Sequence, residues 1–233
     1  MQISPVNFNN DNHLYKQMVG FGHGNNSKNN YTLKQKAFVA GMSALGVFSS
    51  LAIFAKCKGY SLKPSKMFSD LKNSYLATTD FKWQEVVGMG AGSVAGGLAA
   101  GYIIDKNPEN RKAKNREALM QIGNVSIPII TVDLFVDKAL KNASKWTKAL
   151  GGLCGLVVGV TIANIIMNKI NNLIFNENNG RGVKLTDYTV HLDDAVVAAN
   201  YISKEKIIHA IGRLVPIALM IPGNEVGKKT ANH

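Results

Sequence analysis

Amide and ionisable side chains interrupt or end several apolar stretches of this sequence, and they are the first candidates for chemistry. They are Asn124, Asp133, Asn164, His209 and Arg213. Polar groups are costly inside a hydrocarbon environment, so those that persist there often line a path for ions or substrates. The alternative is structural, because such groups also form hydrogen bonds between packed helices. We therefore expect these five residues to form either an intramembrane polar path or a set of interhelical contacts.

Other constellations give little support to catalysis or ligand binding. His191 lies beside Asp193 and Asp194, but no second His or Cys is near in sequence, so the pattern fits a polar helix face better than a metal site. The glycines of residues 88–96 lack the preceding strand and the downstream acidic residue of a dinucleotide-binding loop. The chain has no G-x-S-x-G, Walker, H-E-x-x-H or C-x-x-C motif. We expect no enzymatic activity, no cofactor, no metal and no identifiable small-molecule substrate.

The charge balance is strongly basic, with a formal net charge of +12 over 233 residues. Lysine supplies most of this charge, whereas nucleic-acid-binding proteins favour arginine forks and basic stripes interleaved with aromatic residues. Many of the lysines lie at the ends of apolar runs, as charges flanking membrane spans do. The expected partner is the lipid bilayer and not nucleic acid. A soluble, basic helical protein that binds nucleic acid or another partner is the alternative.

Apolar and charged residues are segregated along the chain. Hydrophobic residues make up 46% and charged residues 18%, below the roughly 25% charged residues of an average soluble protein. Uncharged apolar runs occupy residues 37–55, 86–104 and 149–168. As helices they are about 28–30 Å long, which matches the roughly 30 Å hydrocarbon core of a bilayer. These three runs predict membrane-spanning helices.

Two further runs are shorter and contain prolines and polar residues. They lie at residues 118–132 and 207–221, and the second contains Arg213. An arginine at the centre of a span costs about 2.5–3.5 kcal/mol on insertion scales. Each of these runs therefore either spans the membrane with its polar groups facing protein, or lies at the interface or re-enters from one side.

Glycines recur every fourth residue in two of the long runs, which places them on one face of each helix. The two ladders are Gly88, Gly92 and Gly96, and Gly151, Gly155 and Gly159. A face without side chains lets a second helix backbone approach closely, and this drives association within lipid. We expect both ladders to pack helices together, within the chain or between copies in a homo-oligomer.

The same Lys-Trp dipeptide, at residues 82–83 and 145–146, precedes the two ladders at a constant offset of 63 residues. This spacing predicts a weak internal repeat of residues 82–140 and 145–222, with chance similarity between glycine-rich helices as the alternative. If both hairpins span fully, the two tryptophans lie at the same membrane face.

The remaining segments are more polar. Residues 1–32 are rich in Asn, and we expect them to be disordered. Asn107 followed by Pro108 predicts a helix start. Residues 171–184 have the composition of an exposed loop, and residues 185–202 place apolar residues on one stripe of an amphipathic helix. The helical domain therefore covers residues 33–224, followed by a polar C-terminal tail at 225–233.

Together these patterns predict an all-α, multi-pass bundle of four to five hydrophobic helices, with an added amphipathic helix and a disordered N-terminus. The lysine and asparagine usage suggests a bacterial source and hence the bacterial cytoplasmic membrane. A structural or scaffolding role fits the glycine-packed helices best. The alternatives are a small transporter or channel-like protein with polar residues along a path, and the soluble basic protein named above.

Overall fold

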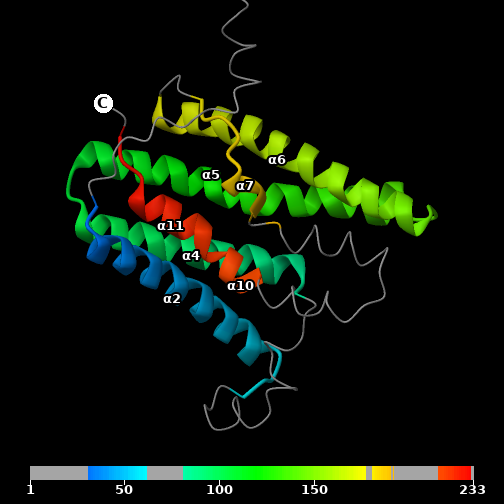
Figure 1. Cartoon of the computed structure of the whole chain (residues 1–233), viewed down its shortest axis with the longest axis horizontal. Coiled ribbons are helices and arrows are strands. Elements are labelled where there is room, and N and C mark those ends of the chain that lie inside the picture. The colour runs from blue at the N-terminus through cyan, green and yellow to red at the C-terminus, as the bar shows by residue number, and fades with distance from the viewer. Residues whose placement is uncertain (1–30, 62–80, 177–179, 190, 192–214, 232–233) are drawn as a thin grey trace, which may run out of the picture.

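A computed structural model describes residues 31–61, 81–176, 180–189, 191 and 215–231, and these ranges contain helices and no strand (Figure 1). The long helices are α2 (Leu33–Cys57), α4 (Trp83–Ile104), α5 (Pro108–Asp133) and α6 (Lys145–Phe175). A π-helical segment, η2 (Leu134–Ala139), continues α5. The short helices are α7 (Thr186–Thr189), α10 (Val215–Ala218) and α11 (Met220–Lys228).

The predicted all-α fold with four apolar helices is confirmed. Among the described residues, α2, α4, α5 with the first part of η2, and α6 are each long and apolar enough, by length and composition, to cross a membrane. They contain the apolar runs at 37–55, 86–104, 118–132 and 149–168. The predicted start of α5 is also confirmed, because the Asn107 side chain accepts a 2.9 Å hydrogen bond from the backbone N–H of Glu109.

The four long helices form an antiparallel row in chain order, in which α4 packs against α2 and α5, and α5 packs against α6 (Figure 1). At one end of the row, the Tyr31 hydroxyl donates a 3.3 Å hydrogen bond to Asp105. We call this the Asp105 end; α2 and α5 begin there and α4 ends there. At the opposite end, Lys58 forms a 2.5 Å ion pair with Glu85. We call this the Glu85 end.

The C-terminal segment packs along this row of helices. Helix α11 packs against α2, α4 and α5 (Figure 1). Val215 and Leu219 join the apolar core formed by α2, α4 and α5. At the far end of the segment, the carbonyl of Lys229 accepts a 2.6 Å hydrogen bond from Lys114. The chain from 215 to 229 therefore runs parallel to α4 and finishes at the Asp105 end.

This arrangement changes the expected C-terminal boundaries. Residues 207–214 of the predicted fifth run lie outside the described residues, but helical structure continues to Lys228, beyond the expected boundary at 225. The reason is packing, because Val226 and Gly227 are buried although their surroundings in sequence are polar. Of the predicted amphipathic helix, only Thr186–Thr189 is described as helical, and residues 192–202 lie outside the described part. Residues 1–30 of the predicted disordered tail also lie outside it.

The tryptophans of the predicted repeat both lie at the Glu85 end. Trp83 begins α4, and Trp146 follows the first residue of α6. Their side chains are 47% and 64% exposed. Such positions suit aromatic side chains at a membrane interface, while the repeat itself stays a prediction.

We predict that both termini of the protein lie on the same side of the membrane. Tyr31 and Lys229 both contact Lys114 at the Asp105 end: its ammonium lies 5.7 Å from the centre of the Tyr31 ring and donates to the Lys229 carbonyl. Tags added at the two ends should therefore be equally accessible to an impermeant label applied from one side. Five complete spans would place the tags on opposite sides, and labelling of only one tag from each side would contradict this topology.

Candidate functional site

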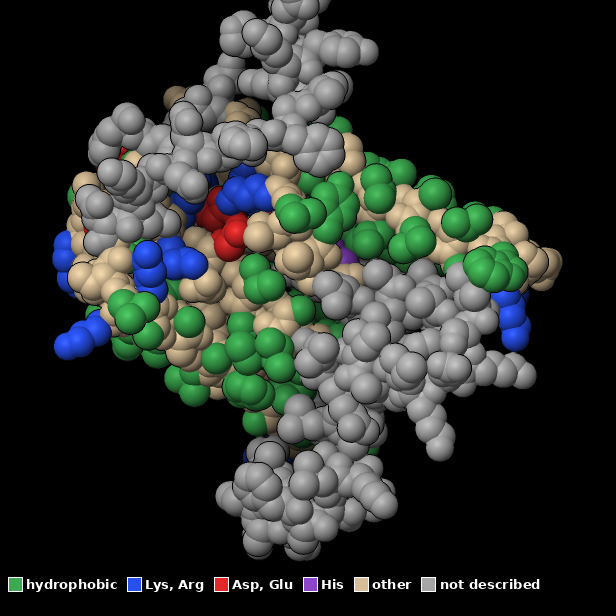
Figure 2. Space-filling model, viewed as in Figure 1, with side chains coloured by type: hydrophobic (Ala, Val, Ile, Leu, Met, Phe, Trp, Pro, Cys, Tyr) green, Lys and Arg blue, Asp and Glu red, His purple; other side chains and the backbone are tan. Residues whose placement is uncertain are grey.

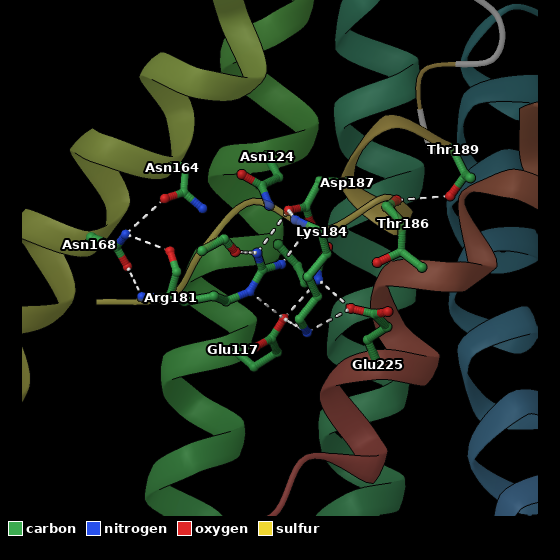
Figure 3. Close-up of polar contacts among 12 residues, drawn as sticks. Glu117, Asn124, Asn164, Asn168, Arg181, Lys184, Thr186, Asp187, Thr189 and Glu225 are labelled. Atoms are coloured by element: carbon green, nitrogen blue, oxygen red, sulfur yellow. Dashed lines mark hydrogen bonds and ion pairs between the residues drawn. The ribbon is translucent and has the colours of Figure 1, made fainter. Parts of the chain in front are cut away.

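A set of polar and charged side chains, about half of them buried, joins the segment 180–189 to α5 and α11 (Figure 3). We call it the polar cluster; its members are Glu117, Gln121, Arg181, Lys184, Asp187 and Glu225. Glu117 and Gln121 are one turn apart on α5, and Glu225 approaches from α11. The cluster therefore connects elements that are distant in sequence.

Arg181 occupies the centre of the polar cluster. Its guanidinium forms a two-pronged contact with Asp187, with N···O distances of 2.8 and 2.6 Å. Its Nε donates to Glu117 at 3.2 Å, and a further N–H donates to the carbonyl of Gly182 at 3.1 Å. Planar, two-pronged pairing is the strongest geometry available to an arginine and a carboxylate. Arg181 thereby holds the 180–189 segment against α5.

Glu117 is the cluster's anchor on α5, and it is 2% exposed. Besides Arg181, its carboxylate accepts a 2.9 Å hydrogen bond from Gln121 and lies 3.5 Å from the ammonium of Lys184. Gln121 and Lys184 both reach Glu225 as well, at 3.0 and 3.4 Å. The same two side chains thus connect α5 to α11, and the cluster ties three elements into one unit.

The electrostatics of Arg181 favour its charged form. Burial acts to lower the pKa of the guanidinium, but the nearby Glu117 and Asp187 carboxylates outweigh it and raise the pKa above its usual value. Removing one member of such a buried set leaves its partners charged and uncompensated, which typically costs about 3–5 kcal/mol. The arrangement is suited to fastening elements together.

Asparagines extend the polar contacts from Arg181 along the interface of α5 and α6. The Asn168 side chain accepts from the backbone N–H of Arg181 and donates to its carbonyl, both at 2.9 Å. It also donates to the Asn164 side chain at 2.8 Å. The NH2 group of Asn164, its Nδ2, is buried without a hydrogen-bond partner. Both polar atoms of the Asn124 side chain are buried and unpartnered as well.

His191 compensates for a proline in α5. Pro128 lies inside this helix and has no N–H to donate to the carbonyl of Asn124, four residues earlier. The Nε2 of His191 lies 2.7 Å from that carbonyl oxygen. Because a carbonyl only accepts, His191 must carry a proton on Nε2 and donate it. A helix carbonyl freed by proline is thus paired within a buried site, as a low-dielectric interior requires.

The predicted polar path is brought together only in part. Asn124 and Asn164 lie at the α5–α6 interface, whereas Asp133 is exposed near the end of α5 and is not a member of the polar cluster. His209 and Arg213 lie outside the described residues, so the predicted pairing of Arg213 with Asp133 stays a prediction.

The sequence interpretation missed the polar cluster. Residues 171–184 were expected to form an exposed loop, yet Asn171 is buried in α6 and the Arg181 side chain is only 14% exposed. His191, which the sequence places on a polar helix face, is 1% exposed, as is Asp187. One signal was present in the sequence: Arg181 is one of four arginines in a lysine-rich chain, and arginine is the residue suited to buried, two-pronged ion pairs.

The glycine ladders both face another helix of the same chain. A Cβ atom added at Gly88 would meet the Phe54 ring, and at Gly92 or Gly96 it would meet the backbone of α2. A Cβ added at Gly155 or Gly159 would meet α5 or η2, and at Gly151 it would meet the side chain of Leu140, just after η2. Each ladder therefore gives the neighbouring segment of the chain room for close approach, while the glycine zipper as the drive for association in lipid stays a prediction.

A second small-residue face, not identified from the sequence, lies on α4. An added Cβ at Gly97 would meet the backbone of Gly223, and at Gly101 the backbone of Gly227. The backbone N–H of Gly223 also donates a 3.1 Å hydrogen bond to Ser93. Small residues four apart on α4 thus meet glycines four apart on α11, and this contact seats the C-terminal helix.

Comparison with protein-family profiles, curated proteins and solved structures found no match for this chain.

Replacing Gly92 by alanine should destabilise the protein by about 2–4 kcal/mol, in the range of other core overpacking and strain effects. The added methyl group would collide with the carbonyl of Gly46 and the Ser50 side chain. Gly41→Ala is the matched control. Gly41 is also inside a long helix, α2, but no atom lies within 4 Å of the position where its Cβ would be. The control should be neutral or stabilising by up to about 1 kcal/mol. Thermal unfolding in detergent measures both, and equal effects would contradict the packing.

Glu117→Gln should destabilise the protein by about 3 kcal/mol, because it leaves Arg181 with less buried negative charge. Glu109→Gln is the control on the same helix, since Glu109 is exposed in the first turn. That change should cost less than about 1 kcal/mol. Denaturant or thermal unfolding distinguishes the two, and a stable Glu117→Gln protein would show that the polar cluster does not fasten the bundle.

The pairing of His191 with the Asn124 carbonyl predicts a specific dependence on Pro128. His191→Leu should cost about 1–3 kcal/mol, because it leaves a buried carbonyl unpaired. In the Pro128→Ala background the restored N–H can bond that carbonyl, so the same change at His191 should cost distinctly less. A double-mutant cycle of unfolding free energies measures the difference, and additive effects would contradict the assigned role.

Proposed function

We propose that this chain is an integral, multi-pass membrane protein with a structural or scaffolding role. Its described part has four helices that are long and apolar enough to cross a membrane. Its contacts fasten helices to one another, through glycine faces and through the polar cluster. These features support a rigid bundle held within lipid.

The observation that carries the proposal is where small and large apolar residues lie, which differs from the arrangement typical of water-soluble proteins. Glycines line the contacts between helices, whereas large apolar side chains point outward along α2 and α6. The outward residues include Leu45, Phe48, Ile53, Leu150, Leu153 and Ile162. Figure 2 shows groups of hydrophobic side chains on the described part of the visible face. In water such a surface would promote aggregation, and each glycine within a helix would cost about 1 kcal/mol relative to alanine.

Lipid removes both difficulties. The outward apolar residues need no protein partner when they face hydrocarbon chains, and close backbone packing replaces the missing hydrophobic drive between helices. The exposed tryptophans at the Glu85 end suit the interface with water. A homo-oligomer stays a prediction, but because both ladders contact helices of the same chain, its interface would need another face.

Carbonate extraction tests the membrane assignment. The expressed protein should remain in the pellet after carbonate washing and should need detergent for release, because its outward apolar surface is stable only in lipid or micelles. Recovery as a monomer without detergent would overturn the proposal.

A second candidate function is a small transporter or channel-like protein. It is favoured by the buried, unpartnered amides of Asn124 and Asn164 between two apolar helices, since polar groups in such positions often lie on solute paths. Flux assays on proteoliposomes containing the purified protein distinguish the two functions. A purely structural protein should give the same ion and solute leakage as empty liposomes.

A further inference from the structure

Two buried amides face each other across the α5–α6 interface without bonding. Asn124 is completely buried and Asn164 is 7% exposed. Two close contacts between α5 and α6 flank the two amides: one joins Gly159 to Pro128, and the other joins Gly123 to Met167. Both amides therefore lie in the same stretch of the α5–α6 interface. Figure 3 shows the two side chains directed toward one another. The Oδ1 and Nδ2 of Asn124 and the Nδ2 of Asn164 have no partner.

The unpartnered atoms specify what is missing. They offer one acceptor and two donors, so the ligand must donate at least one hydrogen bond and accept two. Water has this capacity, and buried waters typically make about three bonds to otherwise unsatisfied polar groups. A cation would find a single free acceptor, and an anion would leave the oxygen of Asn124 unpaired.

The surrounding contacts connect this position to the surface. Asn168 bonds both Asn164 and the backbone of Arg181. Arg181 is flanked by Gly180 and Gly182, which are exposed. A molecule bound between Asn124 and Asn164 would complete a file of hydrogen-bonding groups from this exposed segment to the middle of α5.

We propose that Asn124 and Asn164 bind a water molecule, which completes a polar file leading from the 180–182 segment into the bundle. This site goes beyond a structural role, because it brings solvent to the centre of an apolar helix pair. The water site does not depend on whether the protein transports a solute.

A double-mutant cycle tests the bridge. Leucine has nearly the shape of asparagine, so Asn124→Leu should stabilise the protein if its amide is dry and unpaired. Asn164→Leu also removes the hydrogen bond from Asn168, so the direction of the effect is read from Asn124→Leu. If water bridges them, each change should lower the melting temperature by about 2–4 °C. The double variant should lose no more than the worse single variant, because both remove the same bridge. Thr161→Val, an exposed change on α6, is the control and should be neutral. Higher melting temperatures, or additive losses, would overturn the proposal.

A measurement on the unaltered sequence keeps the test independent of variant folding. With 15N-labelled asparagine in detergent micelles, the side-chain amide protons of both residues should show cross-relaxation with a long-lived water. Its absence would overturn the proposal. Replacing chloride by gluconate should leave the melting temperature unchanged, whereas a chloride-dependent shift would assign the site to an anion instead.

Discussion

The close approach of three elements to α4 is the constraint on which the rest of the structure depends. Its ladder of Gly88, Gly92 and Gly96 faces α2, while Gly97 and Gly101 face the glycines of α11. On a third face of α4, Gly90 lies against the side chain of Val125 in α5. One helix can accept neighbours on three sides at this distance only if its faces lack side chains. The glycine content of α4, which would weaken an isolated helix, is therefore what makes it the centre of the bundle.

The polar cluster depends on this packing. When the glycines of α11 lie on α4, Glu225 is carried to the side of α11 that faces α5, where it meets Gln121 and Lys184. Lys184 and Arg181 then hold the 180–189 segment over Glu117. That segment in turn delivers His191 to the carbonyl that Pro128 leaves without a helical donor. The backbone packing of α11 on α4 thus positions the polar cluster. The cluster in turn positions His191, which supplies the hydrogen bond that Pro128 cannot donate to the Asn124 carbonyl.

Local patterns in the sequence were sufficient to predict the helices but not the cluster. The four long helices and the start of α5 at Asn107 follow from uninterrupted apolar runs and capping residues, and the two glycine ladders follow from spacing within a single turn. Glu117 and Arg181 are 64 residues apart in the sequence. No local sequence pattern indicates that the segment around Arg181 packs against the charged N-terminal half of α5. The spacing of Gly223 and Gly227 is visible in the sequence. Glu225 and Lys228 make this segment too polar for a membrane span, so its burial depends on neighbouring helices that shield these charges.

Cysteine cross-linking in native membranes tests most directly whether α11 packs on α4 within a membrane-embedded bundle. Val94 and Val226 belong to the same buried cluster, so cysteines at both positions, in a background lacking Cys57 and Cys154, should form a disulfide on mild oxidation. Cleavage between α6 and α10 should then leave two fragments that separate only after reduction. The pair of Val226 with Leu150, which is 61% exposed near the start of α6, should not cross-link. Free separation of the Val94 and Val226 fragments without reduction would contradict the account.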